Sequence, residues 1–177
     1  MTRWIEVAGG ALALALFAGA AVAAGPSDAQ IAAIVVTANQ VDIDAGELAK
    51  ARAQSPKVRE FAQQMITDHT GVNKQAGALV TKLKVTPEPN DTSKSLKQGG
   101  DANVASLKTL SGAAFDRAYV DHEVAYHQQV IDALDKTLVP SAQNAELKAL
   151  LVKVRPAFVA HLEHAKQLQA SLAKGSG

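Results

Sequence analysis

Apolar residues recur every three or four positions along nearly all of residues 28–173, and this is the period of one face of an α-helix. The run from Ile31 through Ile34 to Val41 shows the pattern clearly. No segment sustains the alternation of apolar and polar residues that marks a β-strand. Proline, glycine and serine break the helical period at only a few points. We therefore predict four helices, at about 28–53, 56–83, 113–138 and 142–173.

Local signals mark the ends of these helices. Ser27 followed three residues later by Gln30 is a capping-box pattern, and Ser55 before Pro56 is typical of a helix start. Residues 84–112 are too long for a tight turn, and we expect two weakly amphipathic pieces there on either side of a glycine pair. Two helical hairpins joined by such a long, partly helical crossover predict an all-α, ferritin-like four-helix bundle.

The first 24 residues have the three-part layout of a secretory signal. Arg3 lies in a short polar start, an uncharged apolar run follows over 8–18, and small residues precede Gly25. That run is too short to span a bilayer. We expect cleavage after residue 24, a single domain over 25–174 in the periplasm, and no transmembrane span in the mature protein. The alternative is an uncleaved membrane anchor.

Composition excludes several classes of function. The chain carries 18 Lys+Arg and 17 Asp+Glu, so it lacks the excess of positive charge on which nucleic-acid binding depends. It has no cysteine, which removes disulfides, thiolate nucleophiles and thiolate metal sites. Its 177 residues suffice for one hydrophobic core. The function must therefore rest on carboxylates, imidazoles and hydroxyls.

Acidic and histidine side chains lie on the apolar stripes of all four predicted helices. Inward-facing residues of this kind are how metal sites in helix bundles are assembled. A donor set of imidazole and carboxylate without sulfur suits iron, manganese, zinc or copper. The candidate ligands are Asp42, Asp68, His69, Glu123, His127, His161 and His164.

Structural roles for the same residues remain open. Asp68 and His69 are about 100° apart on a helix, so only one of them can point squarely inward. Asp116 and Tyr119 can form a buried hydrogen-bond network with His161 that fixes helix register. We expect His122 to face solvent.

The number of sites is open as well. If the last two helices fold back around residue 140, His127 stands about 12 Å from His161 along the bundle axis, at about 1.5 Å per residue. A single site holding both histidines then requires a skewed connection or a kink at Pro156. Two separate polar layers are the alternative.

Several motifs resemble one known bacterial family. In the first half these are Asn39-x-x-Asp42, Ser55-Pro56-x-Val58 and Met65-x-x-Asp68-His69, and in the second they are Phe115-Asp116-Arg117-x-Tyr119, His127, and Pro156 with His161. The sequence is similar to the family called domain of unknown function 4142, which is grouped with ferritin-like folds. The resemblance covers the predicted mature chain and implies an exported helical bundle. Asp42 stands where the family usually has Glu, and the paired Glu-x-x-His of ferritins is absent, which argues against ferroxidase activity.

Three functions follow from these observations. The first is a periplasmic metal-binding or metal-handling bundle, whose partner is a metal ion. The second is a non-enzymatic structural or interaction module of the cell envelope, whose partner is another envelope protein and whose buried polar residues set helix register. The third, an oxidoreductase that uses a bound metal, is the least favoured of the three. We favour the first of these functions.

Overall fold

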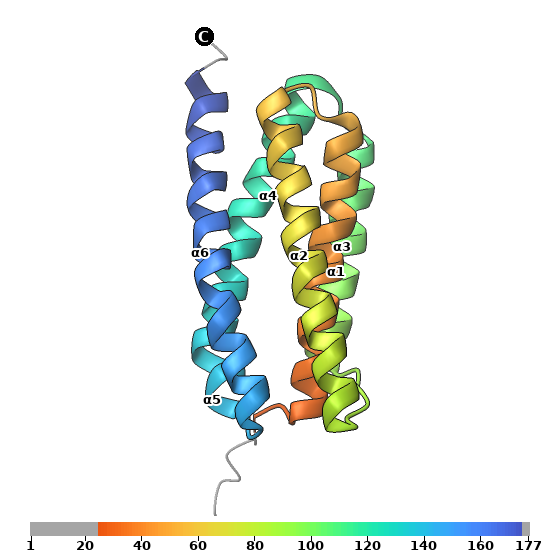
Figure 1. Cartoon of the computed structure of the whole chain (residues 1–177). Coiled ribbons are helices and arrows are strands. Elements are labelled where there is room, and N and C mark those ends of the chain that lie inside the picture. The colour runs from red at the N-terminus through yellow and green to blue at the C-terminus, as the bar shows by residue number, and fades with distance from the viewer. Residues whose placement is uncertain (1–24, 175–177) are drawn as a thin grey trace, which may run out of the picture.

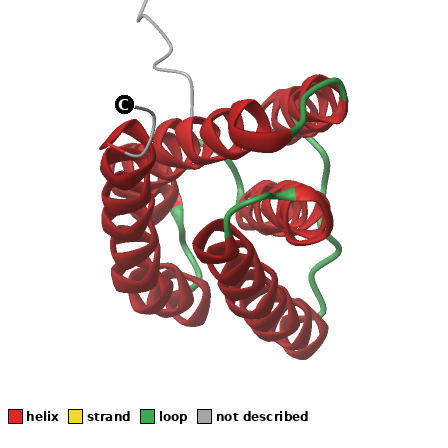
Figure 2. Ribbon diagram, turned by 90° about the horizontal axis from the view of Figure 1, so that it is seen from above, coloured by secondary structure: helices red, strands yellow, loops and turns green. Residues whose placement is uncertain are grey.

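The computed structural model describes residues 25–174, and the predicted export signal at 1–24 lies outside this part of the chain. The described residues form helices and connecting loops only, as Figure 2 shows. None of these helices is long and apolar enough to cross a membrane. The elements in chain order are α1 (Asp28–Arg52), α2 (Pro56–Leu83), α3 (Asp91–Lys108), α4 (Gly112–Ala133), the π-helical segment η1 (Leu134–Leu138), α5 (Val139–Ser141) and α6 (Ala145–Lys174).

The helices form two hairpins that pack together lengthwise. The first hairpin consists of α1 and α2, and the second consists of α4 and α6 (Figure 1). The crossover helix α3 lies against α1 and carries the chain back from the end of α2 to the start of α4. This arrangement confirms the predicted all-α, ferritin-like four-helix bundle with a helical crossover.

The crossover is more regular than the sequence suggested. A single helix, α3, runs from 91 to 108 and continues through Gly99 and Gly100, where we expected a break. The Cβ of any residue larger than glycine at 100 would lie 2.6 Å from a methyl carbon of Val41 in α1. Gly100 therefore permits α3 to approach α1 closely, and this packing outweighs the low helix propensity of the glycine pair.

The connection within the second hairpin also differs from the prediction. We placed it at Pro140 and Ser141, but both residues belong to the helical turn α5, and the loop comes later, at 142–144. Pro140 follows directly on the π-helical turn η1, in which the amide of Val139 bonds to the carbonyl of Leu134. The helical run continues past the proline, and the amide of Ala142 still bonds to the carbonyl of Leu138.

The apolar core has two parts separated by a polar layer. One cluster fills one end of the bundle and includes Ile31, Val72, Leu151 and Phe158, whereas the other fills the opposite end around Phe61. The buried polar residues of the layer come from α1, α2, α4 and α6, between the stretches of each helix that contribute to the two clusters. They are Asn39, Asp42, His69, Glu123, His127 and His161. The layer is thus shielded from water along the bundle axis on both sides.

Asp116 is not part of this layer. Its carboxylate accepts hydrogen bonds from the backbone amides of Gln54 (2.9 Å) and Ser55 (2.7 Å), in the turn between α1 and α2. These amides precede α2, whose own N-cap residue Ser55 makes no side-chain capping bond. Asp116 therefore fixes the position of α4 against the first hairpin, and the suggested network of Asp116 with His161 is not formed.

Candidate metal centre

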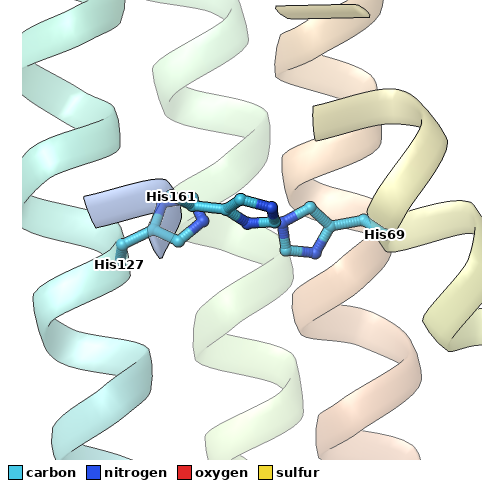
Figure 3. Close-up of side chains that lie close together, drawn as sticks. All are labelled: His69, His127 and His161. Atoms are coloured by element: carbon cyan, nitrogen blue, oxygen red, sulfur yellow. The ribbon is translucent and has the colours of Figure 1, made fainter. Parts of the chain in front are cut away.

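Three histidine rings from three helices converge in the polar layer. The rings of His69 in α2, His127 in α4 and His161 in α6 have centroids 5.3–5.6 Å apart (Figure 3). One ring nitrogen of each lies within 4.8 Å of the corresponding nitrogen of the other two. The histidines therefore form one cluster, and the predicted separation of about 12 Å between His127 and His161 is wrong. The cause is the later connection: because α6 starts at 145, the second hairpin folds back beyond residue 140, which moves His161 toward the level of His127.

Asn39 fixes the protonation of His69. The side-chain amide of Asn39 donates from Nδ2 to the carbonyl oxygen of Val35 (2.7 Å), which leaves Oδ1 facing His69 Nδ1 at 2.7 Å. Because Oδ1 can only accept, Nδ1 must carry the hydrogen of the imidazole. The other nitrogen, Nε2, is buried and has no hydrogen-bond partner. A neutral His69 therefore presents a free lone pair on Nε2.

In His127 and His161, too, one hydrogen bond fixes which ring nitrogen carries the hydrogen. Nδ1 of His127 donates to the backbone carbonyl oxygen of Glu123 (3.1 Å), and Nε2 is left without a partner. Nε2 of His161 donates to the Asp68 carboxylate (2.9 Å), and Nδ1 is left without a partner. Each ring thus has one nitrogen fixed by a neighbour and one lone pair free. Metal-binding histidines are held by second hydrogen bonds of this kind.

Two buried carboxyl groups adjoin the histidines. Oδ2 of Asp42 lies 3.3 Å from Nε2 of His69 and 3.6 Å from Nε2 of His127, the two nitrogens that lack partners. Oε2 of Glu123 lies 3.4 Å from Nδ1 of His127. Neither carboxyl group makes a hydrogen bond of good geometry, although burial ordinarily demands one, and only the Tyr119 hydroxyl is close enough to Glu123 to affect its pKa as a hydrogen-bond donor. Asp42, Glu123 and His127 together form a second group of potential ligands that shares His127 with the first.

Burial shifts the pKa values of acidic and histidine side chains in the polar layer. Loss of solvation, with the neighbouring Glu123, raises the pKa of Asp42 well above its usual value. Loss of solvation raises the pKa of Glu123 to about 8, against a smaller lowering by the Tyr119 hydroxyl. Burial and the neighbouring histidines lower the pKa of His69 well below its usual value, and burial also lowers the pKa of His161. At neutral pH the layer therefore favours uncharged groups, with imidazoles ready to act as ligands and acids that can release protons.

These shifts predict how stability depends on pH in the metal-free protein. Between pH 6.5 and 8, the unfolded chain has an ionised Glu123, whereas the folded protein keeps this carboxyl group protonated. Unfolding then releases a proton, so the free energy of unfolding should fall as pH rises, by about 2 kcal/mol from Glu123 alone, with Asp42 acting in the same direction. His69 and His161 oppose this trend only below about pH 6.5, where the unfolded histidines become protonated. Urea unfolding at several pH values measures the slope.

Glu123→Gln is the matched variant for this prediction, because it keeps the size of the side chain and removes its titration. Its free energy of unfolding should depend less on pH than that of the wild type and should exceed the wild-type value at pH 8. A metal-free wild type whose stability stays constant or increases between pH 6.5 and 8 would contradict the assignment.

The remaining candidate ligands lie outside the cluster. The side chain of Asp68 is 42% exposed and supports His161 from the surface, whereas its neighbour His69 points inward. His164 lies one turn beyond His161, with Nδ1 3.2 Å from Oε1 of Gln64, and its ring packs edge-on against Phe61. His122, which we expected to face solvent, is partly buried and stacks on Tyr126. The histidine cluster thus draws on three of the five histidines in the sequence.

Sequence reasoning missed two residues that shape the centre. Asn39 lies three positions before Asp42 on the buried face of α1, and a polar residue at this position of the stripe was an available signal. Phe158 stacks on the His69 ring, with centroids 5.2 Å apart and planes 8° from parallel. Phe158 lies on the apolar stripe of the last predicted helix, and a helical period gives no information about which ring such a residue will face.

The arrangement has the chemistry of a metal centre. Three imidazoles with fixed hydrogens and one adjacent carboxylate are donors that zinc and copper accept. Without an ion, ten buried side-chain nitrogen and oxygen atoms of the described residues have no hydrogen-bond partner, and seven of them belong to Asp42, His69, Glu123, His127 and His161. A bound cation would satisfy the free nitrogens and the carboxylate together, which supports the fit of these residues to a metal ion.

Comparisons with known proteins agree with this fold. A family model described as domain of unknown function (DUF4142) matches residues 13–168. Among solved structures, CopM in the Cu(II)-bound form is 17% identical with a TM-score of 0.66, and the alignment covers 83% of this chain and 98% of that one. A DUF305 fragment from Deinococcus radiodurans is 16% identical with a TM-score of 0.67, covering 85% of this chain and 99% of that one. No curated protein matches the chain. At these identities the structural neighbours establish a shared helical fold.

Proposed function

This chain belongs to the DUF4142 family, and we propose that it is a metal-handling protein that binds one transition-metal ion through His69, His127, His161 and Asp42. The observation that carries the proposal is the state of the three imidazoles. Each is buried, each has one nitrogen fixed by an outward hydrogen bond, and each has its other nitrogen free. A network that served only to set helix register would pair these atoms, because an unpaired buried polar group costs about 1–3 kcal/mol.

The donor set favours copper(II) or zinc over harder metals. Imidazole nitrogen suits both ions and also iron, whereas magnesium and calcium prefer oxygen ligands. CopM, the structural neighbour described in its Cu(II)-bound form, supports copper as the first ion to test. In this proposal Asp42 loses its proton when the ion binds and supplies the negative charge. Asp68 and the Glu123 backbone carbonyl hold His161 and His127 in place.

Isothermal titration calorimetry of the chelator-treated protein with Cu(II) tests this proposal. Glycine in the buffer competes for copper and suppresses weak surface binding. We expect one binding step with a stoichiometry of about one ion per chain. Binding should weaken as pH falls, first because Asp42, whose pKa burial raises, must release its proton to bind the ion, and further once the pH reaches the lowered pKa values of His69 and His161. A parallel titration with Zn(II) ranks the two ions.

The variants separate the cluster from the other histidines. The double variant His69→Ala/His161→Ala draws on both hairpins and should lose the binding step. His122→Ala and His164→Ala, which change histidines outside the cluster, should keep it. If the wild type bound no metal above background while His161→Ala were strongly destabilised, the register-setting envelope module would be the better account.

Localisation is a second part of the proposal, and the pattern of residues 1–24 supports it. We infer that the protein is exported to the periplasm and cleaved near Ala24. Mass spectrometry of the protein recovered from the native periplasm should show a chain that starts at Ala24 or Gly25. Such a chain lacks Trp4, which is the sequence's one tryptophan, so its tryptophan absorbance should be absent. A membrane-pelleted product that begins at Met1 would contradict export by cleavage.

A further inference from the structure

A cavity of about 1000 Å³ lies between α1, α3, α4 and α6. Aliphatic side chains form much of its wall, among them Ile34, Val35, Val130, Leu134, Leu151 and Val154. Ligand pockets have this size and this mostly apolar lining, with a few polar groups that fix orientation.

The cavity reaches the histidine cluster. His69 and His127, which are 3% and 1% exposed, both contribute to its wall, together with Asn39 and Phe158. Both histidines also have a buried, unpartnered Nε2, so the inner end of the cavity lies beside two of the rings that carry free donor atoms. Polar residues at the start of α3, including Thr92 and Ser95, line the same cavity and are exposed. One space therefore connects solvent near α3 with two of the four proposed metal ligands, His69 and His127.

We propose that this cavity binds a small apolar organic molecule carrying one anionic oxygen group, and that this oxygen becomes a further ligand of the metal ion. The binding of an oxygen group to the metal ion rests on the proposed function. The binding of an apolar molecule in the cavity rests on the lining alone.

The walls determine the tail of this molecule. Aliphatic side chains offer water no hydrogen bonds, so water is poorly held in such a space, and an apolar molecule gains by displacing it.

The charge of the proposed metal centre determines the head group of the molecule. Three neutral imidazoles and the Asp42 carboxylate leave a divalent ion with one uncompensated positive charge in a buried position, which is costly unless it is neutralised. Glu123 approaches His127 from the side of the hydrogen-bonded Nδ1 (3.4 Å) and not from the free Nε2. An anionic oxygen from the cavity would supply the missing charge.

Two substitutions fill the cavity without changing a ligand. Gly99 of α3 lines the cavity, and a Cβ added there meets no atom within 4 Å, so Gly99→Leu starts a side chain in open space at the cavity wall. Ala133→Leu enlarges the opposite wall, on α4. Gly77 of α2 is the matched control, because it has the same open surroundings but does not line the cavity. Circular dichroism confirms that each variant keeps its helical content.

The test uses two probes with the same tail, octanoate and octan-1-ol, titrated calorimetrically into the metal-free and the Cu(II)-loaded protein. We expect both probes to bind the metal-free wild type, and octanoate to bind the Cu(II)-loaded protein about tenfold more tightly than octan-1-ol. Octanoate should also change the electron paramagnetic resonance spectrum of the bound Cu(II). Gly99→Leu and Ala133→Leu should weaken the binding of both probes by about tenfold and keep the copper stoichiometry, whereas Gly77→Leu should bind as the wild type does.

The outcomes separate this inference from the metal proposal. If neither probe binds the wild type, or if both filling variants bind as the wild type does, the cavity is not a ligand site and the inference is overturned, whatever the copper titration shows. If copper binds but octanoate gains no affinity over octan-1-ol, the oxygen ligand is overturned and the apolar pocket is supported. If copper does not bind while the filling variants still weaken octan-1-ol binding, the proposed function fails and the apolar pocket is again supported.

Discussion

Saturating Cu(II) should raise the free energy of unfolding of the wild-type protein by about 4 kcal/mol when free copper exceeds Kd by about a thousandfold. The reason is that the ligands come from four separate helices. Asp42 lies on α1, His69 on α2, His127 on α4 and His161 on α6, and only folding brings them together. Binding to the folded state alone therefore adds directly to stability. Urea unfolding followed by circular dichroism, with and without copper, measures the gain.

The variants make this prediction specific. His69→Ala/His161→Ala should show no stabilisation by copper, whereas His122→Ala should be stabilised as the wild type is. Copper that destabilised the wild type, or that stabilised the double variant equally, would show that the ion binds elsewhere or binds the unfolded chain.

Phe61→Ala should lower the free energy of unfolding by about 3–5 kcal/mol, the usual cost of deleting a fully buried phenylalanine. The Phe61 side chain is completely buried at the centre of the core cluster on one side of the polar layer. Its ring packs edge-on against Tyr119, at 6.2 Å between centroids, and against His164, at 5.1 Å. Removing it leaves a cavity between the two hairpins, because Tyr119 belongs to α4 and His164 to α6. Urea unfolding of the metal-free protein gives the value.

Val152→Ala is the control for this measurement. Val152 is 53% exposed on α6, so its truncation should change stability by less than about 0.5 kcal/mol. A small effect of Phe61→Ala, or two separate unfolding transitions in the wild type, would contradict a single cooperative bundle held by this contact.

The sequence predicted the fold because the information is local and repeated. Helical periodicity, the Ser27 capping box and the Ser55-Pro56 start are each properties of short segments, and the structure forms the capping box as expected. The prediction was wrong where local and tertiary effects compete. The glycine pair in α3 predicts a break, but Gly100 is held in a helix by its close contact with Val41. Pro140 predicts a loop, but it lies in a helical run that continues from η1 through α5.

The candidate site was predictable by residue type and not by geometry. Polar residues on apolar stripes identified Asp42, His69, Glu123, His127 and His161, all of which the structure brings into one layer. The positions of these residues along the bundle axis depended on where the second hairpin folds back. A shift of this fold-back by a few residues moved His161 by several ångströms along the axis. Asn39 was recognisable as a polar residue on the buried face of α1, but its hydrogen bond with His69 joins α1 to α2 and no single helix encodes it.

The central claim is that three imidazoles hold one metal ion, and pulsed electron paramagnetic resonance of the Cu(II)-loaded protein tests it most directly. This measurement counts the imidazole rings bound to copper through their remote nitrogens. We predict three bound rings in the wild type and two in His161→Ala, with wild-type spectra for His122→Ala and His164→Ala. A signal without imidazole coupling, or an identical ring count in His161→Ala and the wild type, would contradict the metal centre proposed for His69, His127 and His161.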